Sequence, residues 1–264
     1  MRRIPLILLL SLFVAAAPAE AIELKPHRAI YSLKLASADS GSGVTDAQGA
    51  MVFEWAESCE SWTTRQRARF DVYSPEGGSV RTEVSFSSWE GKTNGSYGFN
   101  LRTLQDGRVV EDLRGEAKLE GNGGGQAVYS KPRQQRIELP PGTLFPVAHT
   151  KLLIQEAMAG GRQLLRPVFL GQREDEPMMV NAVVTQRAPT AHPTAAGDRN
   201  DLLDRPSWKF HLAFYGADDD LLPAFQIHEV LYDNGVVGDA TVIYDEFSFA
   251  YTLERLEPLP RPKC

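Results

Sequence analysis

Residues 62–73, with the sequence WTTRQRARFDVY, alternate between two kinds of side chain along most of their length. One side of the segment carries Trp62, Ala68, Phe70 and Val72, and the other carries Thr63, Arg65, Arg67, Arg69 and Asp71. Successive side chains of a β-strand point to opposite faces of its sheet, so this pattern predicts a strand with one buried face. Pairing that slipped by one residue would bury every arginine at once, and the three arginines are therefore predicted to lie outside the core.

The same alternation recurs on both sides of this segment. It is found at residues 31–35, 51–55, 80–86 and 97–101, and strand-like patterns return at 165–170, 178–185, 208–215, 225–232, 238–244 and 247–256. Residues that tolerate positive φ stand between many of these runs, at 77–78, 94–95, 106–107, 121–125 and 234–235. Closely spaced strands joined by such turns predict an all-β fold with an antiparallel, meandering sheet. Strands do not alternate with helices, which excludes a doubly wound α/β fold.

Two segments depart from this rhythm. Residues 146–159 have helical spacing, with Pro146 suited to a first turn and glycines at 160–161 to end the helix. We expect one α-helix here that packs a stripe of side chains against the concave face of the sheet, namely Val147, Ile154 and Met158. Residues 188–205 are rich in Pro, Ala, Thr, Gly and Asp, and are predicted to form a surface loop.

The first 21 residues have the three parts of a signal peptide. Arg2 and Arg3 give a positive start, residues 4–14 are almost entirely apolar, and small residues fit cleavage after Ala21 or, as second choice, Ala19. The apolar run of about eleven residues is shorter than the roughly 20 that cross a bilayer. We therefore expect residues 1–21 to be removed and residues 22–264 to form a single soluble domain. The alternative is an N-terminal anchor that is never cut.

The mature chain would be mildly acidic. Loss of residues 1–21 changes the formal charge from −6 to −7, because two arginines and one glutamate are removed. Phosphate binding requires a basic surface, so this composition argues against nucleic acid as a partner.

Two cysteines, Cys59 and Cys264, are the only ones in the chain. An even number of cysteines in an exported protein usually pairs. The bridge would close a loop of about 206 residues, worth roughly 5 kcal/mol at most in the chain-entropy model. The alternatives are two unrelated thiols and an intermolecular bridge through Cys264.

The usual catalytic signatures are missing. We find no Gly-x-Ser-x-Gly, HExxH, Walker or CxxC motif. The five histidines, at 27, 149, 192, 211 and 228, show no metal-ligand spacing on one element, although distant ones could meet in space. The aspartates at 218–220 fit a solvated turn better than a cation site. No cofactor or metal is therefore expected. The row of Arg65, Arg67 and Arg69 is either a solvated face or a face that binds anionic headgroups or glycans.

Several stretches of the chain resemble the EipB-like family of periplasmic cell-envelope integrity proteins. They are LKPHRAIY at 24–31, FPVAHT at 145–150, LYDNGV at 231–236 and YDEF at 244–247, and together they extend over essentially the whole mature chain. The positions of Cys59 and Cys264 match the disulfide pair of that family. One departure is VFLG at 168–171, where an Asp-Gly turn is expected after the phenylalanine.

The resemblance implies a single, strongly bent, spiral-like antiparallel β domain of about fourteen strands with one helix. It also implies a periplasmic location in Gram-negative bacteria, a role in keeping the envelope intact under stress, and no established enzymatic activity.

Three functional hypotheses follow from the residues and the resemblance. The first is a non-enzymatic protein that maintains the envelope by binding other envelope components, with a tetratricopeptide-repeat protein as a candidate partner. The second is a carrier or sensor of a lipid or other amphiphile, in a cavity lined by Met51, Phe53, Trp55, Met158 and Met179. The third is a glycan hydrolase with paired carboxylates, although no pair is singled out by its spacing. Neither the oligomeric state nor the ligand is evident from the sequence.

Overall fold

The structure is a computed structural model that describes residues 22–93, 95–121, 123–174, 177–188, 194, 200–216 and 221–264. The predicted signal peptide at 1–21, most of the predicted loop at 188–205 and the aspartates at 218–220 therefore lie outside the described residues. No helix in the described part of the chain is long and apolar enough to cross a membrane.

One antiparallel sheet contains all 14 strands, in the order β8-β7-β6-β5-β4-β3-β2-β1-β14-β13-β12-β11-β10-β9. Their bounds are β1 (His27–Ala38), β2 (Asp46–Glu57), β3 (Ser61–Tyr73), β4 (Ser79–Gly91), β5 (Ser96–Gln105), β6 (Arg108–Leu119), β7 (Gly125–Lys131), β8 (Gln135–Leu139), β9 (Gln163–Val168), β10 (Met178–Ala188), β11 (Ser207–Tyr215), β12 (Phe225–Tyr232), β13 (Val237–Ile243) and β14 (Phe247–Pro258). The helix α1 (Pro146–Met158) follows β8 in the chain. The predicted all-β, fourteen-strand fold with one helix is confirmed.

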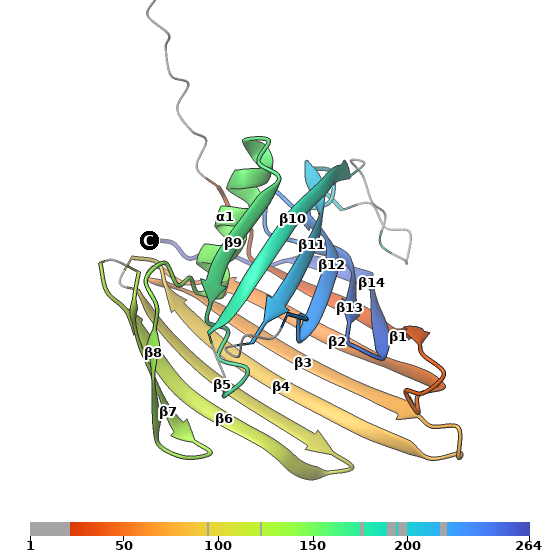
Figure 1. Ribbon diagram of the computed structural model, residues 1–264. Coiled ribbons are helices and arrows are strands. Elements are labelled where there is room, and N and C mark those ends of the chain that lie inside the picture. The colour runs from red at the N-terminus through yellow and green to blue at the C-terminus, as the bar shows by residue number, and fades with distance from the viewer. Residues whose placement is uncertain are drawn as a thin grey trace, which may run out of the picture.

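The sheet consists of two meanders joined along β1 and β14. Within β1–β8 and within β9–β14 each strand pairs with the next, and the long-range pairing of β1 with β14 connects the halves. In Figure 1 the first meander forms a broad, curved layer and the second folds back across it, with α1 beside β9. The two outer edges also approach each other, because the Leu144 N–H donates to Pro167 O at 2.9 Å and the Leu144 carbonyl oxygen accepts from Phe169 N–H at 3.0 Å. The bent sheet therefore curls until its ends nearly meet.

The alternation in β3 has the predicted consequence. Arg65, Arg67 and Arg69 are exposed, whereas Trp62 and Ala68 are buried. Phe70 is half-buried, with its ring 5.7 Å from that of Phe249 on β14.

The helix α1 packs inside the curve of the sheet. Its buried residues are Val147, His149, Leu153, Ile154 and Ala157, and most of them join the core formed by β9–β12 with Trp55 and Trp62. The prediction that Met158 belongs to this stripe is wrong, since Met158 is 46% exposed. The buried face of the helix is rotated toward Leu153 and Ala157, which leaves Met158 at its margin in the last turn.

The departure from the family pattern at 168–171 is a tightly packed turn. Val168 and Phe169 are fully buried. Gly171 has φ +69°, and a Cβ there would lie 2.4 Å from the ring of Phe99. Only glycine fits this conformation against that ring.

Candidate functional site

The outward face of β3–β6 carries a row of basic side chains. Register partners across these strands place Arg65 beside Ser87, Ser87 beside Asn100, and Asn100 beside Arg114. The next row along the strands runs through Arg67, Ser85, Arg102 and Asp112. The predicted arginine row is thus one edge of a wider array that sequence patterns in single strands do not reveal.

Most of these arginines have no acidic partner. In the described part of the chain, no carboxylate lies within ion-pair distance of Arg65, Arg67, Arg102 or Arg114. Two neighbouring acids are already used, since Glu54 pairs with Arg28 at 2.6 Å and Asp112 pairs with Lys131 at 2.8 Å, whereas Glu116 shares the surface with Arg65 and Arg114 without an ion pair to either. Arg69 differs, because its charge helps to lower the pKa of Asp71, which is bound mainly by Arg81. The unpaired charge is therefore concentrated around Arg65, Arg67, Arg102 and Arg114.

A groove of about 810 Å³ crosses this face, and we call it the outer groove. Its lining comes from β3–β7 and includes Thr63, Arg65, Ser87, Trp89, Gly98, Asn100, Arg114, Glu116, Val128 and Ser130. Two arginines, one glutamate and several neutral hydrogen-bonding side chains share this surface with three apolar residues, Trp89, Phe99 and Val128.

Trp89 lies across the floor of the outer groove. Its register partner on β5 is Gly98, and a Cβ at that position would stand only 2.1 Å from the indole Nε1 and 2.5 Å from Cε2. The indole therefore covers the Gly98 backbone, which is buried beneath it, while Trp89 itself is 40% exposed. A large ring held against the sheet with exposed surface is a ready stacking platform.

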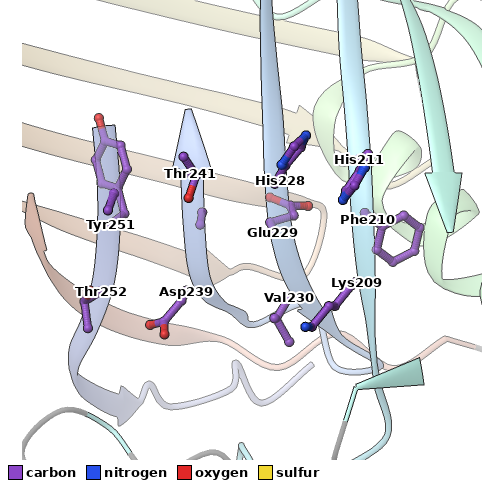
Figure 2. Close-up of a pocket in the computed structure, with 12 residues that line it drawn as sticks. Lys209, Phe210, His211, His228, Glu229, Val230, Asp239, Thr241, Tyr251 and Thr252 are labelled. Carbon is purple, nitrogen blue, oxygen red and sulfur yellow. The ribbon is translucent and has the colours of Figure 1, made fainter. Parts of the chain in front are cut away.

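A second hollow, of about 320 Å³, lies over β11–β14, and we call it the histidine hollow. His211 and His228 are register partners whose rings stack with centroids 3.8 Å apart (Figure 2). The pKa of His228 is lowered, first by partial burial and then by repulsion from His211. The structure thus brings two distant histidines together, but in the described ranges no three metal-binding side chains form a cluster.

Glu229 belongs to the interior side of the same strands. It pairs with Phe210 on β11 and Ala240 on β13, and Phe210 is fully buried in the core. Burial raises the pKa of Glu229 to about 7. Its charge, with that of Asp239, raises the already elevated pKa of the buried Tyr31, whose hydroxyl donates to Val237 O at 2.7 Å.

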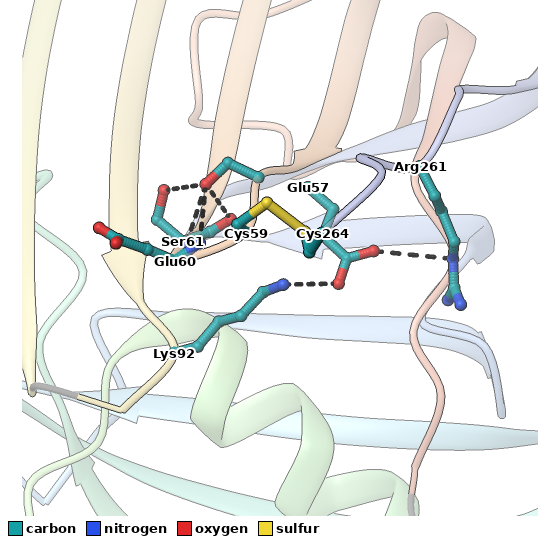
Figure 3. The surroundings of a disulfide bond; sticks show 8 residues. Glu57, Cys59, Glu60, Ser61, Lys92, Arg261 and Cys264 are labelled. Atoms are coloured by element: carbon teal, nitrogen blue, oxygen red, sulfur yellow. Dashed lines mark hydrogen bonds and ion pairs between the residues drawn. A yellow bond between two sulfur atoms is a disulfide. The ribbon is translucent and has the colours of Figure 1, made fainter.

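Cys59 and Cys264 are joined in the structure, with their Cα atoms 5.7 Å apart. Cys59 lies in the β2–β3 turn, where Ser58 and Ser61 bond to each other (Figure 3). The chain end is fixed further by Leu259 N–H, which donates to Pro26 O at 2.9 Å. Arg261 adds contacts to Glu23, Leu24 O and Glu57. The bridge therefore fastens a proline-rich tail to the N-terminal part of the sheet.

The start of α1 is capped by a residue from another element. Its N-cap, Phe145, offers no side-chain acceptor, and the carboxylate of Glu90 on β4 accepts from Val147 N–H at 2.7 Å and Ala148 N–H at 2.9 Å. Burial raises the pKa of Glu90 to about 7, although these two hydrogen bonds act in the opposite direction. A capping carboxylate at a helix N-terminus also fits the helix dipole.

The five side chains predicted to line a lipid cavity divide into two groups, because Met51, Phe53 and Trp55 on β2 pack against the core whereas Met158 and Met179 are exposed. Trp55 is buried with its ring 5.3 Å from that of Trp62. None of the five, which include Met51 and Phe53, lines the outer groove or the histidine hollow. The predicted lining is therefore not brought together as one set.

Comparisons with known proteins place the chain in a family. A family model described as EipB-like matches residues 18–260. The chain is 30% identical over 246 residues to the "Cell envelope integrity protein EipB" of Brucella abortus (strain 2308), covering 92% of this chain and 87% of that protein. A crystal structure from Brucella abortus, described as a beta-barrel-like protein of domain of unknown function DUF1849, superposes with a TM-score of 0.83 at 31% identity, covering 91% of this chain and all of that one. The chain therefore belongs to the EipB-like family.

Proposed function

We propose that this chain is exported to the periplasm, where it maintains envelope integrity without catalysis by binding another envelope component through the outer face of β3–β6. The observation that carries the proposal is the set of arginines there that lack an acidic partner. Four unpaired cations close together on an acidic protein repel one another, and an external anion would relieve that repulsion. The name of the Brucella relative supports the envelope role. The disulfide fits an oxidising compartment.

The partner that we propose is an envelope protein, with a tetratricopeptide-repeat protein as candidate, or an envelope lipid or glycan. The carrier hypothesis remains the second candidate in the form of surface binding, since two of the five residues proposed for its interior lining, Met158 and Met179, are exposed. Glu229 and Asp239 both line the histidine hollow, but the Asp239 carboxylate already accepts from Leu253 N–H at 2.9 Å, so this pair gives the hydrolase hypothesis little support.

The test is complementation of a deletion strain of the producing bacterium. The wild-type gene should restore growth on detergent, and the Arg65→Glu/Arg67→Glu variant should not, although it accumulates and melts like the wild type. Lys209→Glu, an exposed charge reversal on β11, should restore growth. Full rescue by the double variant would show that this face is not the functional one. A deletion strain as resistant as its parent would refute the envelope role itself.

A further inference from the structure

We propose that the outer groove binds an acidic oligosaccharide, with a sugar ring stacked on Trp89 and carboxylate groups held by Arg65 and Arg114. This inference rests on the proposed function, because it names the ligand class for the same face. The groove runs across strands rather than along a sheet edge, so a peptide cannot bind there by adding a strand.

The two arginines of the outer groove are the reason to propose an acidic ligand. Arg65 on β3 and Arg114 on β6 occupy one row, separated by Ser87 and Asn100. Three strand spacings of roughly 4.8 Å place their Cα atoms about 14 Å apart, enough for more than one sugar unit between them. A guanidinium holds a carboxylate through two parallel N–H donors, and this geometry favours arginine over lysine at such sites. Both side chains are exposed and unpaired within the described residues, so each is available to a ligand.

Trp89 is the reason to propose a ligand that contains sugar rings. The C–H bonds on one face of a pyranose ring are weakly positive and pack against the electron-rich face of an indole. Such stacking needs a tryptophan that lies flat and is open on one side, and Gly98 permits this because any larger residue would collide with the indole. The other tryptophans, at 55, 62 and 208, are all buried.

The other residues that line the outer groove fit a glycan better than a lipid surface. Ser87, Asn100 and Ser130 can donate to and accept from sugar hydroxyls, and they would find few partners in an acyl layer. Glu116 lies beside Gly98 in the groove, where its carboxylate would be repelled by a continuous sheet of anionic headgroups. A carboxylate at this position can accept hydrogen bonds from sugar hydroxyls. This mixture of two cations, one anion and neutral polar groups fits a ligand whose charges are spaced by hydroxyl-bearing rings.

The experiment measures binding of tetragalacturonate to the purified mature protein, by calorimetry and by tryptophan fluorescence. Its fully methyl-esterified form is the matched probe, with the same rings and no charge. We expect saturable binding of the acid, a change in emission that Trp89→Phe abolishes, and affinity for the ester weaker by about tenfold or more, as loss of charged hydrogen bonds predicts. Arg65→Glu/Arg114→Glu and Trp89→Ala should each lose about tenfold or more for the same reason.

The control is Arg166→Glu/Lys209→Glu, an equal charge reversal at exposed sites on β9 and β11 that should leave binding unchanged. Circular dichroism and melting curves should be alike for all variants. Equal affinity for tetragalacturonate and its methyl ester would overturn the proposal. So would a loss of affinity in the control variant as large as the loss in Arg65→Glu/Arg114→Glu. Binding to phosphatidylglycerol vesicles without binding to the oligosaccharide would assign the face to a membrane instead. If the oligosaccharide fails while Arg65→Glu/Arg67→Glu still abolishes rescue, the proposed function stands and only the ligand class is wrong.

Discussion

Glu90 and Glu229 are two carboxyl groups whose protonation is controlled by burial. Glu90 has a structural task, because it accepts the first backbone donors of α1. Glu229 stands among Phe210, Ala240 and the buried Tyr31, and no described residue donates a hydrogen bond to its carboxylate. Both have a pKa raised to about 7, so both cost stability when they ionise.

Replacing Glu229 by glutamine should therefore change how stability depends on pH. In the unfolded chain this carboxyl loses its proton near 4.5, whereas the folded protein retains it until about pH 7. Between these values the unfolded state binds fewer protons, so stability falls as pH rises. We expect the wild type to lose melting temperature relative to Glu229→Gln from pH 4.5 to pH 7, with a constant difference above pH 8. A difference that is constant across the whole range would show that Glu229 has an ordinary pKa.

For single residues, sequence patterns predict exposure within a strand but not the contacts between strands. The exposure of Arg65 and Arg67 follows from alternation within one strand, and it was predicted. The contact of Trp89 with Gly98 and the stack of His211 on His228 depend on register between strands, which alternation does not specify. A tryptophan at an outward position was the available signal for the outer groove, since exposed aromatic side chains are enriched at binding sites.

At the scale of elements, the helix was placed correctly, and its buried face was predicted correctly at Val147 and Ile154 but not at Met158. The proline and glycine signals define α1 almost to the residue, because they act locally on the backbone. Which side of the helix is buried depends on how β9 and the β4 carboxylate Glu90 hold it, and this is tertiary information. The β6 and β7 strands were indicated mainly by their turns; at one of these, Asp106 and Gly107 both have positive φ.

The two ends of the helical stripe provide a matched test. Ile154 is fully buried and Met158 is 46% exposed, although both were predicted to face the core. Ile154→Asp would force an unpaired charge into that core, with a cost of about 4 kcal/mol or more, whereas Met158→Asp should change stability by less than about 0.5 kcal/mol. Urea unfolding of the two variants measures both values. Similar stability of the two would mean that α1 is rotated from the position described here.

The whole molecule is held in shape at two places far apart in the sequence. The contact of Leu144 with β9 brings the sheet edges together, and the Cys59–Cys264 bridge closes the chain end to end. The cysteine pairing was predictable because only two cysteines exist. The near-closure of the sheet was not, since it depends on the accumulated bend of 14 strands.

Removal of the bridge should weaken this closure without changing the fold. It spans a sequence separation of 205 residues, and the chain-entropy model sets a ceiling of roughly 5 kcal/mol on its contribution. Part of the tail should stay attached in its absence, because Leu259 still donates to Pro26 O and Arg261 still reaches Glu57. We expect Cys59→Ser to melt several degrees lower and to expose residues 262–264 to carboxypeptidase. Cys264→Ser and the double variant should show the same loss, and a reductant should lower the wild type equally. A double variant that melts well below either single variant would show that the two sulfurs act separately, which contradicts a shared structural bridge.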